Sequence, residues 1–321
     1  MMLAQLQDPA IVRVSAGTIA LLTSATALGE IGKRTARSER AREIFANVAT
    51  RTYAWWLMVA ALLAAILAGP AVALALYAII SFLALREFAR LGIDAKRDRL
   101  ALGAALVLAI PLQYALVWFH LYGIFAVALP VYAFAAISIA VALSGETRNF
   151  LVRATSLQWG LLACVYGLSH VPALLAANSV AHPSAGTKLL IFLIVVVQMS
   201  DVLQYVFGKV FGKHPIAPAL SPNKTVEGFA GGVATAPALG AALWWLTPYT
   251  PLEAAAMSLL LCLLGFCGGL VMSAFKRDRG LKDFGTLLPG HGGMLDRVDS
   301  LVFAAPVFFH LTRFFFGFPG F

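Results

Sequence analysis

The chain has 321 residues, of which 60% are hydrophobic and only 12% are charged, and its mean hydropathy is +0.84. A soluble protein needs roughly twice this share of charged residues to cover its surface, so the composition excludes a soluble enzyme, a disordered protein and a disulfide-stabilised scaffold. The net charge of +9 is typical of basic loops beside a membrane, and we expect no nucleic-acid partner. The three cysteines lie in apolar segments without a CxxC pair, which argues against a zinc site.

Apolar segments in chain order predict an all-α, polytopic integral membrane protein with about ten transmembrane helices, since one helix needs about 20 mostly apolar residues to cross the hydrocarbon core. The first span is the least apolar, because it contains Arg13 and several Ser and Thr residues. We expect a retained helix there, because residues 1–10 contain no Lys or Arg and include Asp8. The predicted spans are residues 11–29, 54–69, 71–88, 100–119, 121–143, 155–176, 188–206, 225–247, 253–274 and 299–318.

The basic residues predict how these spans are oriented. If the N-terminus starts outside, the cytoplasmic loops contain every Lys and Arg of the chain except Arg13, Lys188 and Arg313. Cytoplasmic loops of membrane proteins are enriched in these residues. We therefore predict that both termini are non-cytoplasmic.

Polar residues divide the chain into two parts. Residues 1–154 form a predicted N-terminal transmembrane scaffold, and residues 155–321 form a predicted catalytic region, because polar and glycine content rises after Gln198. Its cytoplasmic loops, residues 207–224 and 275–298, are expected to carry the chemistry.

A transporter is the alternative, but it predicts internal repeats and charges at the membrane midplane, whereas here the acids cluster near one face.

The most polar segment is Ser273–Ser300, which contains four Asp residues and five Lys or Arg residues. Its glycines interrupt a helix and let backbone N–H groups approach a ligand. Asp296 and Asp299 are three residues apart, so a helix there places both carboxylates on one side, and Asp283 supplies a third across the turn. Mg²⁺ commonly binds to one or two carboxylates together with phosphate groups of a substrate. These aspartates therefore indicate a site for Mg²⁺ and a nucleoside triphosphate. Two interleaved basic residues suit its phosphate oxygens: Lys282 and Arg297.

A second polar segment covers residues 198–232. Asp201 lies near the cytoplasmic end of its span, and acids within spans are costly and generally functional. The following loop contributes Lys224, and Thr225 is a candidate N-cap for the next helix. Glu227 is either a functional acid or an ordinary first-turn residue of that helix. The GKVFGKH stretch lacks the spacing and the Ser or Thr of a nucleotide-binding P-loop, so we reject that interpretation.

Residues 273–299 resemble the characteristic motif of phosphatidate cytidylyltransferases, also called CDP-diacylglycerol synthases. The upstream SPNKTVEG and GKVFGKH stretches are also similar to elements of that family. The chain departs from the family pattern after Asp201, where Gln204-Tyr205 replaces the usual Ala-Tyr. The clear match covers residues 201–300. All twelve fixed positions of the motif are present: Ser273, Lys276, Arg277, Lys282, Asp283, Pro289, His291, Gly292, Gly293, Asp296, Arg297 and Asp299.

This resemblance implies that CTP and phosphatidic acid react to give CDP-diacylglycerol and pyrophosphate. The lipid phosphate itself attacks the α-phosphorus of CTP, so no protein nucleophile is required. His291 either acts as an acid toward pyrophosphate or orders the glycine turn. The implied catalytic residues are Asp283, Asp296, Asp299 and Lys282. The implied Mg²⁺ ligands are Asp201, Asp283, Asp296 and Asp299. The implied substrate-binding residues are Ser221, Lys224, Ser273, Lys276, Arg277, His291, Gly292, Gly293 and Arg297.

The same resemblance implies a homodimer in the bacterial inner membrane, among membrane lipids, with its active site on the cytoplasmic face and a monovalent cation such as K⁺ near Mg²⁺. Two related functions stay open at this point. A CTP-dependent lipid kinase would phosphorylate a lipid hydroxyl and release CDP. A cytidylyltransferase acting on an ether-lipid phosphate would differ only in its lipid substrate.

Overall fold

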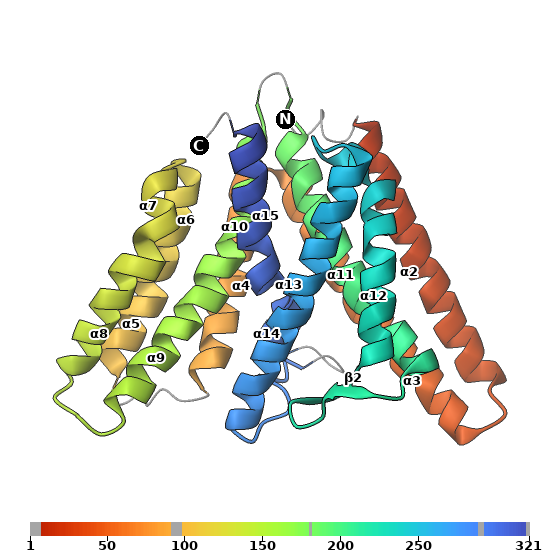
Figure 1. The fold of residues 1–321 in the computed structure, drawn as a ribbon, viewed down its shortest axis with the longest axis horizontal. Helices are drawn as coiled ribbons and strands as arrows, with labels where there is room; N and C mark the ends of the chain where they lie inside the picture. Colours follow the sequence, from red (N-terminus) through yellow and green to blue (C-terminus); the bar gives the residue numbers. More distant parts are fainter. Residues whose placement is uncertain (1–7, 91–97, 180–181, 288–291, 319–321) are drawn as a thin grey trace.

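A computed structural model describes residues 8–90, 98–179, 182–287 and 292–318. Within these residues the chain forms a bundle of helices with one small β-hairpin (Figure 1). The prediction of a helical, polytopic membrane protein is confirmed, because eight described segments are long and apolar enough to cross a membrane. They are Pro9–Thr35, Ala41–Ala68, Pro70–Ala89, Arg99–Trp118, Tyr122–Ala142, Phe150–Ala177, Ala185–Phe211 and Pro251–Asp278.

The N-terminal helices α2 (Pro9–Thr35) and α3 (Glu39–Ala68) pack against each other, and α4 (Pro70–Ala89) follows. Each of the first two helices begins at a polar N-cap, because the first N–H groups of a helix have no partner within it. Asp8 accepts the N–H of Ala10, and Ser38 accepts the N–H of Ala41.

The next three spans contain π-helical segments. Pro130 lies within one of them and Pro111 closely follows another, and proline lacks the N–H that a regular α-helix requires. The π-helical segments are η1 (Ala105–Ala109), η2 (Ala128–Ala133) and η3 (Leu162–Gly167). The flanking helices are α5 (Arg99–Ala104), α6 (Ile110–Trp118), α7 (Tyr122–Val127), α8 (Phe134–Ala142), α9 (Phe150–Leu161), α10 (Leu168–Ala173) and the 3₁₀ turn η4 (Leu174–Ala177).

Helix α11 (Ala185–Phe211) leads into an antiparallel hairpin, which occupies most of the loop predicted at residues 207–224. Helix α12 (Val226–Ala242) follows directly. Thr225 caps it by accepting the N–H of Gly228 at 3.1 Å, so the predicted N-cap is confirmed. The hairpin strands are β1 (Pro215–Ala217) and β2 (Ser221–Thr225). The last elements are η5 (Trp244–Leu246), α13 (Pro251–Asp278), α14 (Leu295–Val298) and α15 (Leu301–Phe316).

Two of the ten predicted spans are shorter in the structure than expected. Residues 225–247 contain α12, which has 17 residues, and residues 299–318 contain α15, which has 16 residues. Helix α12 is shorter because the chain turns into η5 soon after Ala242. Helix α15 is shorter because Asp299 and Ser300 form a turn between α14 and α15. Eight long spans and two shorter helices therefore take the place of the ten predicted spans.

The arrangement of the helices brings the two polar loops together. Helices α11, α12 and α13 pack against one another, and α15 packs against α10 and α13. The hairpin and the end of α13 lie at one end of the bundle, whereas the start of α2 and the end of α15 lie at the opposite end (Figure 1). The segments from which the sequence predicts chemistry therefore meet near one end of the bundle.

Candidate active site

A cavity of about 230 Å³ lies where α11, α12 and α13 meet strand β2. Its walls combine residues that are far apart in the sequence, because the packing of the three helices closes a space between them. Four residues predicted from the sequence line it together: Asp201, Lys224, Ser273 and Asp299. Gln204 and Tyr205, where the chain departs from the family pattern, line the same cavity.

Two acids of the cavity converge on one hydroxyl group. The Ser300 hydroxyl donates to Asp201 Oδ2 at 2.6 Å and lies 3.5 Å from Asp299 Oδ1, which also accepts the Ser300 N–H at 2.9 Å. Asp201 comes from α11, whereas Asp299 follows α14. Because one hydroxyl proton cannot satisfy two carboxylates, the pair keeps free oxygen lone pairs and a concentrated negative charge. Such a pair attracts a cation.

Lys224 supplies the positive charge of the cavity. Its ammonium group donates to the carbonyl oxygen of Phe266 at 3.4 Å and lies 4.6 Å from the centre of that ring. Burial lowers the pKa of Lys224, while the charges of Asp201 and Asp299 oppose this shift. The partly buried ammonium group of Lys224 is suited to bind a phosphate oxygen, while the two acids bind a metal ion that accompanies the phosphate.

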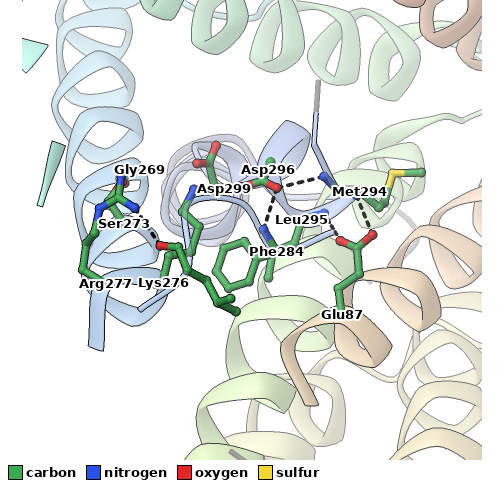
Figure 2. Close-up of polar contacts among 12 residues, drawn as sticks. Glu87, Gly269, Ser273, Lys276, Arg277, Phe284, Met294, Leu295, Asp296 and Asp299 are labelled. Carbon is green, nitrogen blue, oxygen red and sulfur yellow. Dashed lines mark hydrogen bonds and ion pairs between the residues drawn. The ribbon is translucent and has the colours of Figure 1, made fainter. Parts of the chain in front are cut away.

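Asp296 makes different contacts from Asp299, although the sequence predicted both carboxylates on one side of a helix. Its Oδ1 pairs with the Lys276 ammonium at 2.7 Å, and its Oδ2 accepts the N–H groups of Phe284 and Gly293, each at 2.9 Å (Figure 2). Asp299 keeps a helical backbone conformation directly after α14, but its carboxylate contacts Ser300, whereas that of Asp296 contacts Lys276. Asp296 and Lys276 therefore hold the loop against α13 and do not line the cavity.

Glu87 is a buried acid that is absent from the site residues predicted from the sequence. It lies near the end of α4, and its two oxygens accept the N–H groups of Met294 and Leu295, both at 2.9 Å (Figure 2). A Cβ atom at Gly293 would lie 2.3 Å from Glu87 Oε2, so a larger residue there would displace the Glu87 carboxylate. Helix α4 thus contacts the start of α14 directly. A signal for this residue was present in the sequence, because Glu87 lies within the predicted span 71–88, and acids within spans are generally functional.

The loop after α13 contains several other predicted site residues. Lys282 and Asp283 are exposed and do not line the cavity. Gly292 has a φ of +79°, and a Cβ atom there would lie 2.7 Å from Asp296 Oδ2, so the turn requires glycine. His291 lies outside the described residues, so its role stays a prediction.

The remaining predicted residues connect the loops or provide free donors. Arg277 donates to the carbonyl oxygens of Leu220 at 3.1 Å and Leu281 at 2.6 Å, which ties the hairpin and the loop to α13. Ser221 starts strand β2 and pairs with Ala217.

Within the described part of the chain, the buried Nε of Arg297 has no hydrogen-bond partner. Unsatisfied buried donors are rare, and this one belongs to a side chain whose charge interacts with Asp299 and Asp296.

The carboxylates of the cavity meet part of what the implied Mg²⁺ ion needs. Mg²⁺ commonly uses one or two protein carboxylates together with substrate phosphates, and the converging pair of Asp201 and Asp299 fits that chemistry. Across the described ranges, no three His, Cys, Asp or Glu side chains lie close enough to hold a metal ion by themselves. The four aspartates predicted as ligands therefore do not form one cluster there, and the substrate would have to supply further ligands.

Comparisons with known proteins agree with the motif. Residues 49–315 match the sequence profile of the cytidylyltransferase family. A protein of Escherichia coli strain K12, named "Uncharacterized protein YnbB", is 39% identical over 270 residues, which cover 84% of this chain and 88% of that protein. The phosphatidate cytidylyltransferase of Staphylococcus saprophyticus is 41% identical over 134 residues, which cover 39% of this chain and 48% of that protein. The enzyme of the same name from Mycobacterium leprae is 44% identical over 134 residues, or 41% of this chain and 42% of that protein. The chain thus matches about half the length of these two enzymes.

Proposed function

The chain belongs to the cytidylyltransferase family, and we propose that it is a phosphatidate cytidylyltransferase, which joins CTP to phosphatidic acid and releases pyrophosphate. The observation that carries this proposal is the cavity in which Asp201, Asp299 and Lys224 lie together. The cavity combines negative and positive groups, as the binding of a cation and a polyphosphate together requires. The partial similarity to named phosphatidate cytidylyltransferases supports the choice of lipid.

The position of the cavity suits one soluble substrate and one membrane substrate. It lies among helices long and apolar enough to span a membrane, near the end that carries the hairpin and the loop after α13. A lipid phosphate is held at the level of the membrane surface, and CTP arrives from water. We place this end on the cytoplasmic face of the bacterial inner membrane, because the basic residues concentrate in the loops of that end.

The proposed reaction needs no covalent intermediate with the protein. An oxygen of the lipid phosphate attacks the α-phosphorus of CTP. A new P–O bond forms while the bond from the α-phosphorus to the oxygen bridging it to the β-phosphate breaks, and pyrophosphate leaves with that electron pair. Lys224 holds a phosphate oxygen, and Ser300 orients the carboxylates of Asp201 and Asp299. These two acids would hold Mg²⁺, whose charge neutralises the phosphate oxygens.

Radiolabelled CTP tests the proposed function. The purified full-length protein in detergent receives phosphatidic acid, Mg²⁺ and CTP labelled either on the α- or on the γ-phosphate. We expect the α-label in the lipid product, the γ-label in pyrophosphate, and no turnover when EDTA removes Mg²⁺. In a parallel reaction that supplies a lipid alcohol as acceptor, the γ-label in the lipid fraction, with release of CDP, would instead identify a lipid kinase. Turnover with an ether-lipid phosphate but not with phosphatidic acid would identify the related cytidylyltransferase.

A further inference from the structure

We propose that Arg51, Tyr205 and Lys209 bind the phosphate group of a lipid phosphomonoester at the membrane-facing edge of the cavity. This inference rests on the proposed function, because it names the part of the same site that receives the lipid. Tyr205 lines the cavity, and 53% of its surface is nevertheless exposed. Its ring therefore lies where the cavity meets the surface of the protein.

Two cations flank the ring of Tyr205. The guanidinium carbon of Arg51, from α3, and the ammonium nitrogen of Lys209, from α11, each lie 5.7 Å from the ring centre. Both basic side chains are exposed, and neither forms an ion pair with any acid among the residues that the structure describes. Two like charges near one ring repel each other, and an anion bound close to both would offset that repulsion. The arrangement therefore favours an anionic ligand.

A third cation continues this positive surface towards the acids. Arg297 lies close enough to Arg51 for their charges to repel each other, and also close to Asp299. Its buried Nε has no hydrogen-bond partner in the described part of the chain. This nitrogen is enclosed by the protein, so Arg297 contributes to the positive region through its charge. A phosphate at Tyr205 would lie beside Arg51, whose charge also acts on Arg297.

The surface beside Tyr205 is suited to acyl chains. Val202, Val206 and Val210 are exposed and recur along α11 at intervals of four residues, next to Tyr205 and Lys209. These positions form one face of α11, which is long and apolar enough to cross a membrane. Acyl chains can contact the valines while the attached phosphate contacts the cations. A lipid can then reach the cavity by lateral movement in the membrane.

The charge of this site favours a phosphomonoester over a phosphodiester. A phosphomonoester carries a charge of about −1.5 to −2 at neutral pH, whereas the phosphodiester of an ordinary phospholipid carries about −1. Cations without acid partners attract the more highly charged phosphomonoester more strongly. The hydroxyl of Tyr205 can also donate to a phosphate oxygen. The site would therefore select phosphatidic acid from the excess of phosphodiester lipids around it.

A binding experiment without CTP tests this site independently of turnover. The full-length protein in detergent is titrated with radiolabelled phosphatidic acid, and phosphatidylglycerol with the same acyl chains serves as the phosphodiester. We expect Arg51→Ala and Lys209→Ala each to weaken phosphatidic acid binding about tenfold, and Arg51→Lys to restore most of the loss. The matched control is Arg148→Ala, which removes an exposed arginine between α8 and α9 and should leave binding unchanged. Unchanged binding in the Arg51→Ala/Lys209→Ala double variant would overturn the inference, as would equal binding of both lipids to the wild type.

Steady-state kinetics separate this inference from the proposed function. In an active enzyme, the KM for phosphatidic acid should rise about tenfold in Arg51→Ala, while the KM for CTP and the kcat stay unchanged. An active enzyme whose variants keep the wild-type KM for phosphatidic acid overturns the lipid site and leaves the function standing. A wild type that binds phosphatidic acid through Arg51 and Lys209, but forms no liponucleotide, overturns the function and supports the site.

Discussion

Ser300 is the residue at which the two acids of the cavity meet. Because Asp201 and Asp299 both approach its hydroxyl, removing the charge of either acid should weaken cation binding without leaving a void. We expect Asp299→Asn to lower kcat about a hundredfold and to raise the Mg²⁺ concentration needed for half-maximal activity. Mg²⁺ titrations of pyrophosphate release measure both effects.

A matched control for this substitution is Asp278→Asn at the end of α13. The Asp278 side chain is 71% exposed and pairs with the neighbouring Arg279 at 3.2 Å, away from the cavity. This variant should keep the Mg²⁺ dependence of the wild type. If Asp299→Asn behaves in the same way as Asp278→Asn, the assignment of Asp299 to the cation site is wrong.

Lys224 gives the cavity a specific pH dependence. Burial lowers its pKa below the usual lysine value of 10.5, so its ammonium loses a proton at a lower pH than an exposed lysine does. We expect the KM for CTP to rise as the pH increases into the range in which Lys224 loses its proton. In Lys224→Arg the guanidinium stays charged, so the rise should disappear. Measurements of the KM for CTP from about pH 7 to pH 10 test this. The same rise at alkaline pH in the wild type and in Lys224→Arg would contradict it.

Among the elements, the contact between α4 and α14 connects the N-terminal half of the chain to the segment that carries Asp296 and Asp299. Glu87 accepts the N–H groups of Met294 and Leu295 with separate oxygens. In Glu87→Gln one oxygen becomes an NH₂ group that faces an N–H donor, which should cost about 1–3 kcal/mol. We expect a lower melting temperature and a kcat reduced about tenfold, because Asp296 lies in this helix and Asp299 directly follows it.

The thermal unfolding of Glu87→Gln is best compared with that of Glu43→Gln. Glu43 is an exposed acid on α3, so the same chemical change there should leave both stability and kcat close to the wild type. Limited proteolysis of the loop between α13 and α14 provides a second measurement, and it should be faster only in Glu87→Gln. Equal proteolysis rates and equal activity in the two variants would show that the contact does not position the loop.

For the whole molecule, the distribution of basic loops predicts that the hairpin end faces the cytoplasm. In a variant without native cysteines, a single cysteine is introduced either by Arg148→Cys, between α8 and α9, or by Pro248→Cys, between η5 and α13. Both positions are exposed. A membrane-impermeant maleimide added to intact spheroplasts should label Pro248→Cys, and should label Arg148→Cys only after the membrane is opened. The reverse pattern would contradict the proposed orientation.

The sequence by itself determined the class of protein, the family and the residue types of the site. Its apolar composition admits only a membrane protein, and the motif from Ser273 to Asp299 is enough to indicate the cytidylyltransferase family. The N-cap at Thr225 was also predictable, because capping depends on residues close together in the chain. The homodimer, the monovalent cation and the role of His291 stay predictions.

Only the tertiary structure decided which acids share the cavity. Spacing along a helix places Asp296 and Asp299 on one side, but Asp296 pairs with Lys276, twenty residues earlier, whereas Asp299 lies beside Ser300 and the cavity. Asp201 joins Asp299 only because α11 packs beside the turn that follows α14. The contact of Glu87 spans 207 residues of chain. Local spacing fixes which side chains can point together, whereas the meeting of distant carboxylates depends on how whole helices pack.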